Sequence, residues 1–240
     1  MQRDTRPKKL IKEIRVRPSF CLDPDRPDLE QIGMRYARLL TEKFDYRLSP
    51  CSHICLYVTE YGQDSEFVLR GIVDSTVMFF VDVLFDHKAI DVNYHDYTVN
   101  LIARVLAEIA SNEGVDPEPI EEARQIMLAE KDDLLIPWKS RISVTKKYRI
   151  EPYIKIKGIG SYASLLYVKI SDLIAKKSAV RLVAELPIGE LEEAAQRIKV
   201  QNDELKLTPK RNSGELVMAR MRGYVFPITV PLSEFDWKSE

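Results

Sequence analysis

Cysteine and histidine are scarce in this chain, with three residues of each among its 240. Three cysteines are too few for a disulfide framework, and an odd number suits a reducing compartment where thiols stay free. No stretch reaches the roughly eighteen uninterrupted apolar residues of a membrane-spanning helix. The charged N-terminal stretch has no apolar run behind it, unlike a signal peptide. We therefore expect a cytoplasmic protein with no membrane among its partners.

The common catalytic signatures are also missing from the sequence. It contains no G-x-S-x-G nucleophile elbow, no H-E-x-x-H zinc motif and no P-loop lysine motif. The histidines, His53, His87 and His95, have no evident nucleophile partner. These absences favour a binding protein over an enzyme, and we expect no cofactor.

Charge is present in distinct blocks, although the net charge of the whole chain is only −1. Residues 1–44 carry 11 basic and 7 acidic side chains, residues 45–136 carry 6 and 18, and residues 137–240 carry 19 and 12. In one interpretation the blocks face and neutralise each other. In the other, the acidic middle block forms a face that attracts a basic protein partner. The near-neutral total argues against a nucleic-acid partner.

The hydrophobic pattern predicts an α+β fold with mainly antiparallel sheets and about four to five covering helices. The segments 53–61, 66–73 and 76–85 are rich in β-branched and aromatic residues, which predicts a meander of antiparallel strands, the third of them central. The sequence LLIPWKS suggests two lobes, residues 1–135 and 138–240, which can also be continuous with each other.

Helical periodicity marks several other segments. It predicts helices over 25–44, 94–114 and 115–131, and a short one at SDLIAKK, residues 171–177. In the first of these, one face carries large apolar side chains: Leu29, Ile32, Tyr36, Leu39 and Leu40.

Two cysteines and a histidine lie close together in SPCSHICLYVTEY. On a strand, Cys51 and Cys55 would be about 13 Å apart, too far to share one ion. In a helical turn they would stand at i and i+4 and could bind a metal with Cys21 and a histidine. The sequence lacks the second half of a zinc motif, so buried, unreactive cysteines are our default interpretation.

Glycines in IKIKGIGSYASLL offer a candidate nucleotide site. Gly158, Gly160 and Ala163 fit a G-x-G-x-x-A pattern, and Glu185 follows where a ribose-binding acid would stand. The preceding segment alternates with lysines, and the following one resembles a strand more than a helix. A glycine-containing hairpin is the alternative interpretation.

The stretch VDVLFDHK offers a candidate metal-dependent nuclease site. Asp74, Asp86 and Lys88 could place carboxylates on magnesium and a lysine beside the attacking water. This arrangement resembles the general PD-(D/E)xK nuclease pattern, although the proline before Asp74 is missing. The alternative is a strand that ends in solvent at Asp86.

Lysine and arginine dominate residues 138–158, with Tyr148 and Tyr153 between them. Such a stretch could follow phosphates and stack on bases. It could equally be the solvated face and protected edge of an antiparallel sheet, which we favour.

Taken together, these patterns predict a non-catalytic protein-binding protein, in concrete terms an immunity-type inhibitor that covers a basic toxin such as a nuclease. The alternative is a metal-dependent nuclease or a nucleotide-binding enzyme. The sequence leaves the oligomeric state open. The residues expected to contact the basic partner are all acidic and lie in or near the middle block: Asp82, Asp86, Asp91, Asp96, Glu113 and Glu118.

Overall fold

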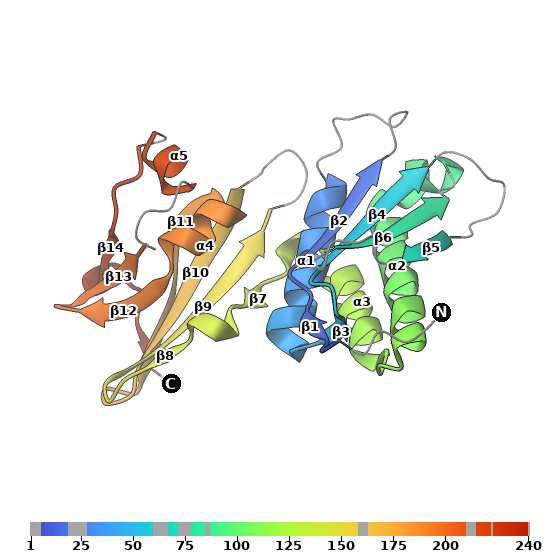
Figure 1. Cartoon of the computed structure of the whole chain (residues 1–240). Helices are drawn as coiled ribbons and strands as arrows, with labels where there is room; N and C mark the ends of the chain where they lie inside the picture. The colour runs from blue at the N-terminus through green and yellow to red at the C-terminus, as the bar shows by residue number, and fades with distance from the viewer. Residues whose placement is uncertain are drawn as a thin grey trace. The chain divides into compact units, whose positions relative to one another are not determined.

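The chain has the α+β fold that the sequence predicts, with helices and mainly antiparallel strand pairs (Figure 1). It divides into two compact units: unit 1 runs up to Leu134, and unit 2 comprises Leu135–Lys157 and Ser161–Glu240. The division into the predicted lobes, 1–135 and 138–240, stays a prediction. The computed structural model describes residues 6–18, 28–59, 67–71, 78–84, 87–157, 163–209, 215–221 and 223–239.

Unit 1 is built on a four-stranded mixed sheet with the order β2-β4-β6-β5. These strands are β2 (Glu13–Pro18), β4 (His53–Thr59), β6 (Met78–Leu84) and β5 (Phe67–Gly71). β4 pairs in parallel with both β2 and β6, whereas β5 runs antiparallel to β6. A short second sheet pairs β1 (Lys9–Leu10) with β3 (Arg47–Ser49).

The predicted antiparallel meander is wrong for one of its two strand pairs. β6 lies between β4 and β5, so it is central as predicted, but it runs parallel to β4, with Leu56 beside Val81. Strands with apolar residues on both faces suit parallel and antiparallel neighbours alike. Periodicity therefore identified the strands but could not determine which of them pair.

Helix α1 (Asp28–Phe44) packs against β2 through the apolar face that the sequence predicts. The five predicted side chains are all at most 3% exposed. Gly33 lies on the same helix, where a side chain would meet the carbonyl oxygen of Ile14 in β2. The absence of a side chain at position 33 therefore lets the helix approach the strand closely.

Two further helices complete unit 1, and they pack against α1 and against each other (Figure 1). They are α2 (His87–Glu113) and α3 (Glu118–Glu130), which a 3-10 turn, η1 (Lys131–Asp133), follows. The Tyr36 hydroxyl donates to the carbonyl of Ile120 at 2.6 Å, and the Tyr46 hydroxyl donates to that of Asp116 at 2.7 Å. These two buried tyrosines fix the start of α3.

The same two tyrosines should make unit 1 sensitive to alkaline pH. Burial raises the pKa of Tyr46 from 10.0 to about 12, and it raises the pKa of Tyr36 still further. Both groups bind their proton more tightly in the folded state, so the stabilisation is complete below about pH 10 and is lost as the pH rises towards the folded pKa values. Urea unfolding, monitored by circular dichroism at a series of pH values, should show this decline in the free energy of unfolding. In Tyr36→Phe the decline should be shallower, and pH profiles of equal slope would contradict the prediction.

The main sheet of unit 2 is antiparallel. Its long strands are β9 (Tyr148–Ile156), β10 (Ala163–Asp172) and β11 (Lys177–Pro187). The segment after Gly160, which resembles a strand more than a helix in the sequence, is confirmed as a strand, β10. The segment 171–177 was predicted to be a helix, which is wrong: it ends β10, turns over Leu173–Lys176 and begins β11. Short pieces join the sheet at its margins: β7 (Ile136–Pro137), β8 (Ser143–Val144) and β15 (Lys238–Ser239).

One face of this sheet is buried and carries Ile150, Ile154, Leu166, Val168 and Ile170. Helix α4 (Ile188–Ala194) contacts β10 and β11. The remaining elements of the unit are a three-stranded sheet and short helices: η2 (Lys139–Arg141), β12 (Arg197–Gln201), β13 (Glu204–Thr208), α5 (Glu215–Met221), β14 (Ile228–Pro231) and η3 (Leu232–Glu234).

Candidate functional site

Carboxylates gather where the chain enters α3. Asp116, Glu118, Glu121 and Glu122 are all exposed and lie within seven consecutive positions, and we call them the acidic α3 start. Acidic groups at this end stabilise a helix through its dipole, by about 0.3–1 kcal/mol each. Stabilisation of the helix is therefore sufficient to explain why some of these positions are acidic, even if they bind no partner.

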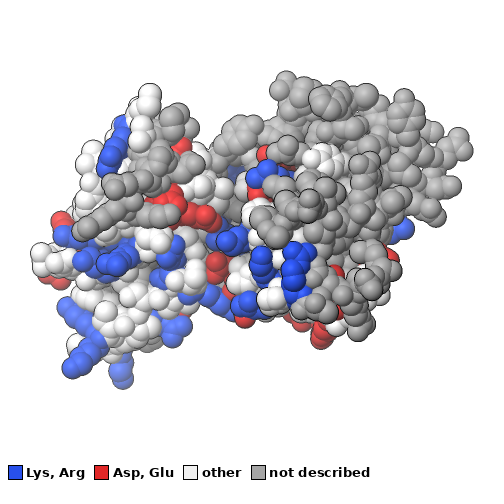
Figure 2. Space-filling view, in the orientation of Figure 1, with Lys and Arg blue, Asp and Glu red and all other residues white. Residues whose placement is uncertain are grey.

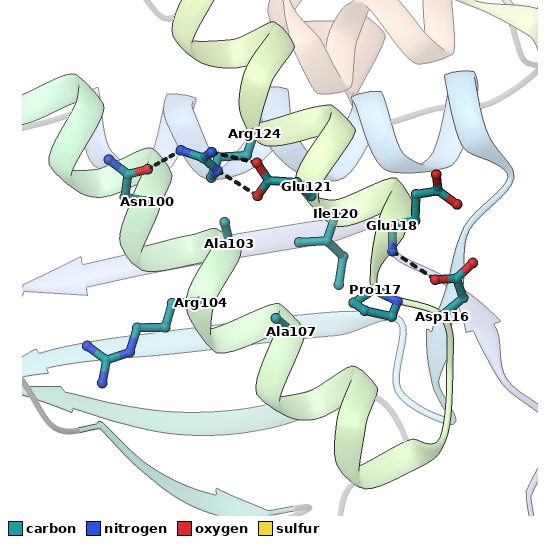
Figure 3. A pocket seen from close by; sticks show the side chains of 10 residues that line it. All are labelled: Asn100, Ala103, Arg104, Ala107, Asp116, Pro117, Glu118, Ile120, Glu121 and Arg124. Atoms are coloured by element: carbon teal, nitrogen blue, oxygen red, sulfur yellow. Dashed lines mark hydrogen bonds and ion pairs between the residues drawn. The ribbon is translucent and has the colours of Figure 1, made fainter.

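A pocket of about 500 Å³ lies between α2 and α3 beside the acidic α3 start (Figure 3). Ala103 and Ala107 of α2 line it together with Pro117 and Ile120, the latter on α3. The small alanine side chains leave the space between the helices open. The polar lining residues are Asn100, Arg104, Asp116, Glu118, Glu121 and Arg124.

Arg124 connects the two helices along one side of the pocket (Figure 3). Its Nε donates to Glu121 Oε2 at 2.7 Å, its NH2 to Glu121 Oε1 at 2.5 Å and its NH1 to Asn100 Oδ1 at 2.8 Å. The Arg124 guanidinium holds the pKa of the Glu121 carboxyl below its ordinary value, with a smaller contribution from Gln125. The charge of Glu121 is therefore already balanced within the chain.

The other carboxylates of the acidic α3 start differ from Glu121. Across the residues that the structure describes, no lysine or arginine forms an ion pair with Asp116, Glu118 or Glu122. Asp116 Oδ1 accepts a hydrogen bond from the backbone N–H of Glu118 at 3.0 Å, which keeps the carboxylate in place. Two of these three unpaired carboxylates, Asp116 and Glu118, line the pocket.

The structure describes the side chains of three of the six predicted partner-binding acids, Asp96, Glu113 and Glu118, and these three have different surroundings. Glu118 is exposed and lines the pocket. Asp96 is half-buried on α2, with His95 Nδ1 at 3.1 Å and Lys131 Nζ at 3.6 Å from its Oδ1. Glu113, also half-buried, ends α2, and its carbonyl accepts from Lys8 Nζ at 2.6 Å.

The other three predicted acids have no described side chain. Asp82 lies on β6 opposite Tyr57, and Asp91 lies in α2. Asp86 is outside the described residues. Asp116, Glu121 and Glu122 were not among the residues predicted from the sequence to bind a partner.

The candidate nuclease set is largely outside the described part of the chain. Asp74 and Asp86 both fall there, and Lys88 lies in the first turn of α2. The nuclease site therefore stays a prediction.

Cys51 and Cys55 are both buried and form no disulfide, so the predicted burial of these two thiols is confirmed. Cys55 lies within β4, and Cys51 precedes it in a turn that hydrogen bonds to Ser49 Oγ hold. A search of the described residues found no group of three or more His, Cys, Asp or Glu side chains suited to a metal ion.

The candidate nucleotide motif lies between β9 and β10. Gly158 and Gly160 are outside the described residues, but the strands on either side of them pair antiparallel, which confirms the hairpin interpretation. Glu185 lies on β11 and accepts a hydrogen bond from Lys157 Nζ at 2.5 Å. A strand thus follows the loop where a dinucleotide-binding motif needs a helix.

Comparison with protein-family models, with curated protein sequences and with solved structures found no match to this chain. None of the helices that the structure describes is long and apolar enough to cross a membrane.

Proposed function

We propose that this chain is a non-catalytic protein that binds a basic protein partner through the acidic α3 start and the adjoining pocket. The observation that supports this most directly is the set of carboxylates without an ion-pair partner, Asp116, Glu118 and Glu122, of which Asp116 and Glu118 line the pocket. In concrete terms, we propose an immunity-type inhibitor that covers a basic toxin or enzyme.

The pocket suggests how the partner is held. A lysine or arginine side chain has an apolar stem and a charged head, and such side chains bury the stem while the head stays polar. The stem would lie along Ala103, Ala107 and Ile120, and the head would reach Asp116 or Glu118. Arg124 and Glu121 already neutralise each other, so they shape the pocket without repelling a cation.

Charge reversal at the acidic α3 start should weaken capture of the partner. In Glu118→Lys/Glu122→Lys we expect association at low salt to slow by about tenfold or more, because opposite charges on two proteins speed their encounter. The effect should shrink as added salt screens the charges. Association can be followed by fluorescence anisotropy with a labelled oligolysine peptide, and then with the partner captured from native cells.

The matched control is Glu30→Lys/Asp236→Lys, which changes the net charge equally at two exposed positions elsewhere. A basic protein retained by the wild type and by this control, but lost from Glu118→Lys/Glu122→Lys, would support the proposal. If all three chains retain the basic protein equally, the acidic α3 start does not bind it and the proposal is wrong.

A further inference from the structure

Two turns lie side by side at one end of unit 2, at the lower end of that unit in Figure 1. The first joins β8 to β9 and the second joins β10 to β11, and the backbone N–H of Leu173 donates to the carbonyl of Lys147 at 2.8 Å. We call residues 144–147 and 173–177 the double-turn tip.

Internal hydrogen bonds hold both turns. Asp172 Oδ1 accepts from the backbone N–H groups of Ile174 and Ala175 at 3.0 and 2.9 Å, which lowers the pKa of this carboxyl. Thr145 Oγ1 accepts from the backbone of Lys147 and Tyr148 at 3.3 and 2.9 Å. The directions of the side chains at the tip are therefore set by the backbone.

The tip exposes large aliphatic side chains. Ile174 is 72% exposed, Val144 64% and Leu173 47%. Turns ordinarily carry glycine, proline, asparagine, aspartate or serine, because these residues favour turn conformations and meet water without cost. Adjacent exposed aliphatic groups therefore point to an interaction surface.

Lysines surround these aliphatic groups. Lys146, Lys147 and Lys176 are exposed, and Figure 2 shows blue side chains projecting from this end of unit 2. Lys147 Nζ lies 4.8 Å from the centre of the Tyr148 ring, and Lys177 Nζ lies 4.7 Å from that of Trp237.

The carboxylates near the tip balance only part of this positive charge. Asp172 is 7% exposed and accepts hydrogen bonds within its own turn, and Lys147 and Lys177 also help to lower its pKa. Asp203 lies on the turn between β12 and β13, outside the tip. Asp236 is exposed beside Trp237. The tip itself is therefore cationic.

We propose that the double-turn tip docks on an anionic lipid surface. Leu173, Ile174 and Val144 would enter the boundary between headgroups and acyl chains, while the lysines contact the acidic headgroups. Tyrosine and tryptophan favour the same boundary, because each ring is apolar with one polar atom, and Tyr148 and Trp237 lie under the lysines. Aliphatic side chains offer no stacking to bases, which favours lipid over nucleic acid.

This contact differs from the membrane contact that the sequence argues against. The absence of a long apolar run excludes a spanning segment, whereas the tip would only touch the surface. The proposal is independent of the acidic α3 start, which lies in unit 1.

The test is sedimentation of the full chain with vesicles of phosphatidylcholine, with and without added phosphatidylserine. The wild type should bind only the vesicles that contain phosphatidylserine, and added salt should weaken the binding. Ile174→Asn should reduce the vesicle affinity by roughly tenfold, since it removes an apolar side chain from the lipid. In the double variant Lys146→Glu/Lys176→Glu, each of the two substitutions should reduce the vesicle affinity by at least about fivefold.

Matched controls separate the tip from general effects. Val225→Asn removes an aliphatic side chain that is 80% exposed, and Arg197→Glu/Lys199→Glu reverses two exposed charges on β12. Both should retain the binding of the wild type. Failure of the wild type to sediment with phosphatidylserine vesicles, or equal loss in control and tip variants, would overturn the proposal. If the chain binds a single-stranded oligonucleotide more tightly than the vesicles, and Ile174→Asn does not change this binding, the lysines bind nucleic acid and the proposal is wrong.

Discussion

Replacing Gly33 with alanine should destabilise unit 1 by about 3 kcal/mol, in the range of severe overpacking. The new Cβ would lie 2.1 Å from the carbonyl oxygen of Ile14 and 3.1 Å from its carbonyl carbon. Both are backbone atoms of β2, so no side chain can rotate away and the helix or the strand must move. Alanine is the better helix former by up to about 1 kcal/mol, which offsets only part of this cost.

Hydrogen exchange measured by mass spectrometry can locate this effect. Peptides from α1, β2 and β4 should lose protection in Gly33→Ala, because α1 packs directly on the sheet of unit 1. Glu30→Ala is the matched control, since Glu30 is exposed on the same helix and its replacement should change stability by less than about 0.5 kcal/mol. Wild-type protection in Gly33→Ala would mean that α1 and β2 do not approach as closely as described.

Replacing Trp138 with alanine should have a similarly large effect on unit 2. Trp138 is 2% exposed, and removal of so large a buried side chain typically costs about 3–5 kcal/mol. Its ring also supports Arg141, whose guanidinium carbon lies 5.4 Å from the ring centre. Arg141 in turn donates to the carbonyl and the side chain of Gln196 at 3.1 and 2.7 Å. The substitution therefore leaves a cavity, and it also removes the support of Arg141, which joins η2 to the segment at Gln196.

Fluorescence offers a convenient measurement, because the chain has two tryptophans and both lie in unit 2. In Trp138→Ala, the remaining Trp237 should report a lower midpoint of urea unfolding. Ile142→Ala removes a nearby side chain that is 38% exposed and should shift the midpoint little. A midpoint equal to that of the wild type in Trp138→Ala would show that Trp138 contributes little to the core.

The candidate site could be predicted from the sequence only in part. The acidic block at 45–136 was visible in the charge counts, and Glu118 was among the residues chosen from it. Charge counts do not show which carboxylates already have partners. The pair of Arg124 with Glu121 is local to α3, three positions apart, whereas the hydrogen bond from Arg124 to Asn100 and the pocket depend on α2 and α3 lying side by side.

By itself, the sequence determined the features that arise from neighbouring residues. The buried face of α1 followed from helical periodicity, and the β9–β10 hairpin followed from two alternating segments around glycines. The burial of Cys51 and Cys55 followed from their place at the start of an apolar strand. Each of these depends on interactions within a few positions of the chain or on simple removal of apolar surface from water.

The tertiary structure decided the features that depend on distant partners. β6 runs parallel to β4 because the path of the chain between them brings it back in the same direction, and strand periodicity is equal in both arrangements. The segment 171–177 has residues that a helix accepts, yet pairing of β10 with β11 and the Asp172 cap make it a turn. Local propensities amount to a few tenths of a kcal/mol per residue, about 0 to 0.7 for most types, so long-range strand pairing and burial overrule them.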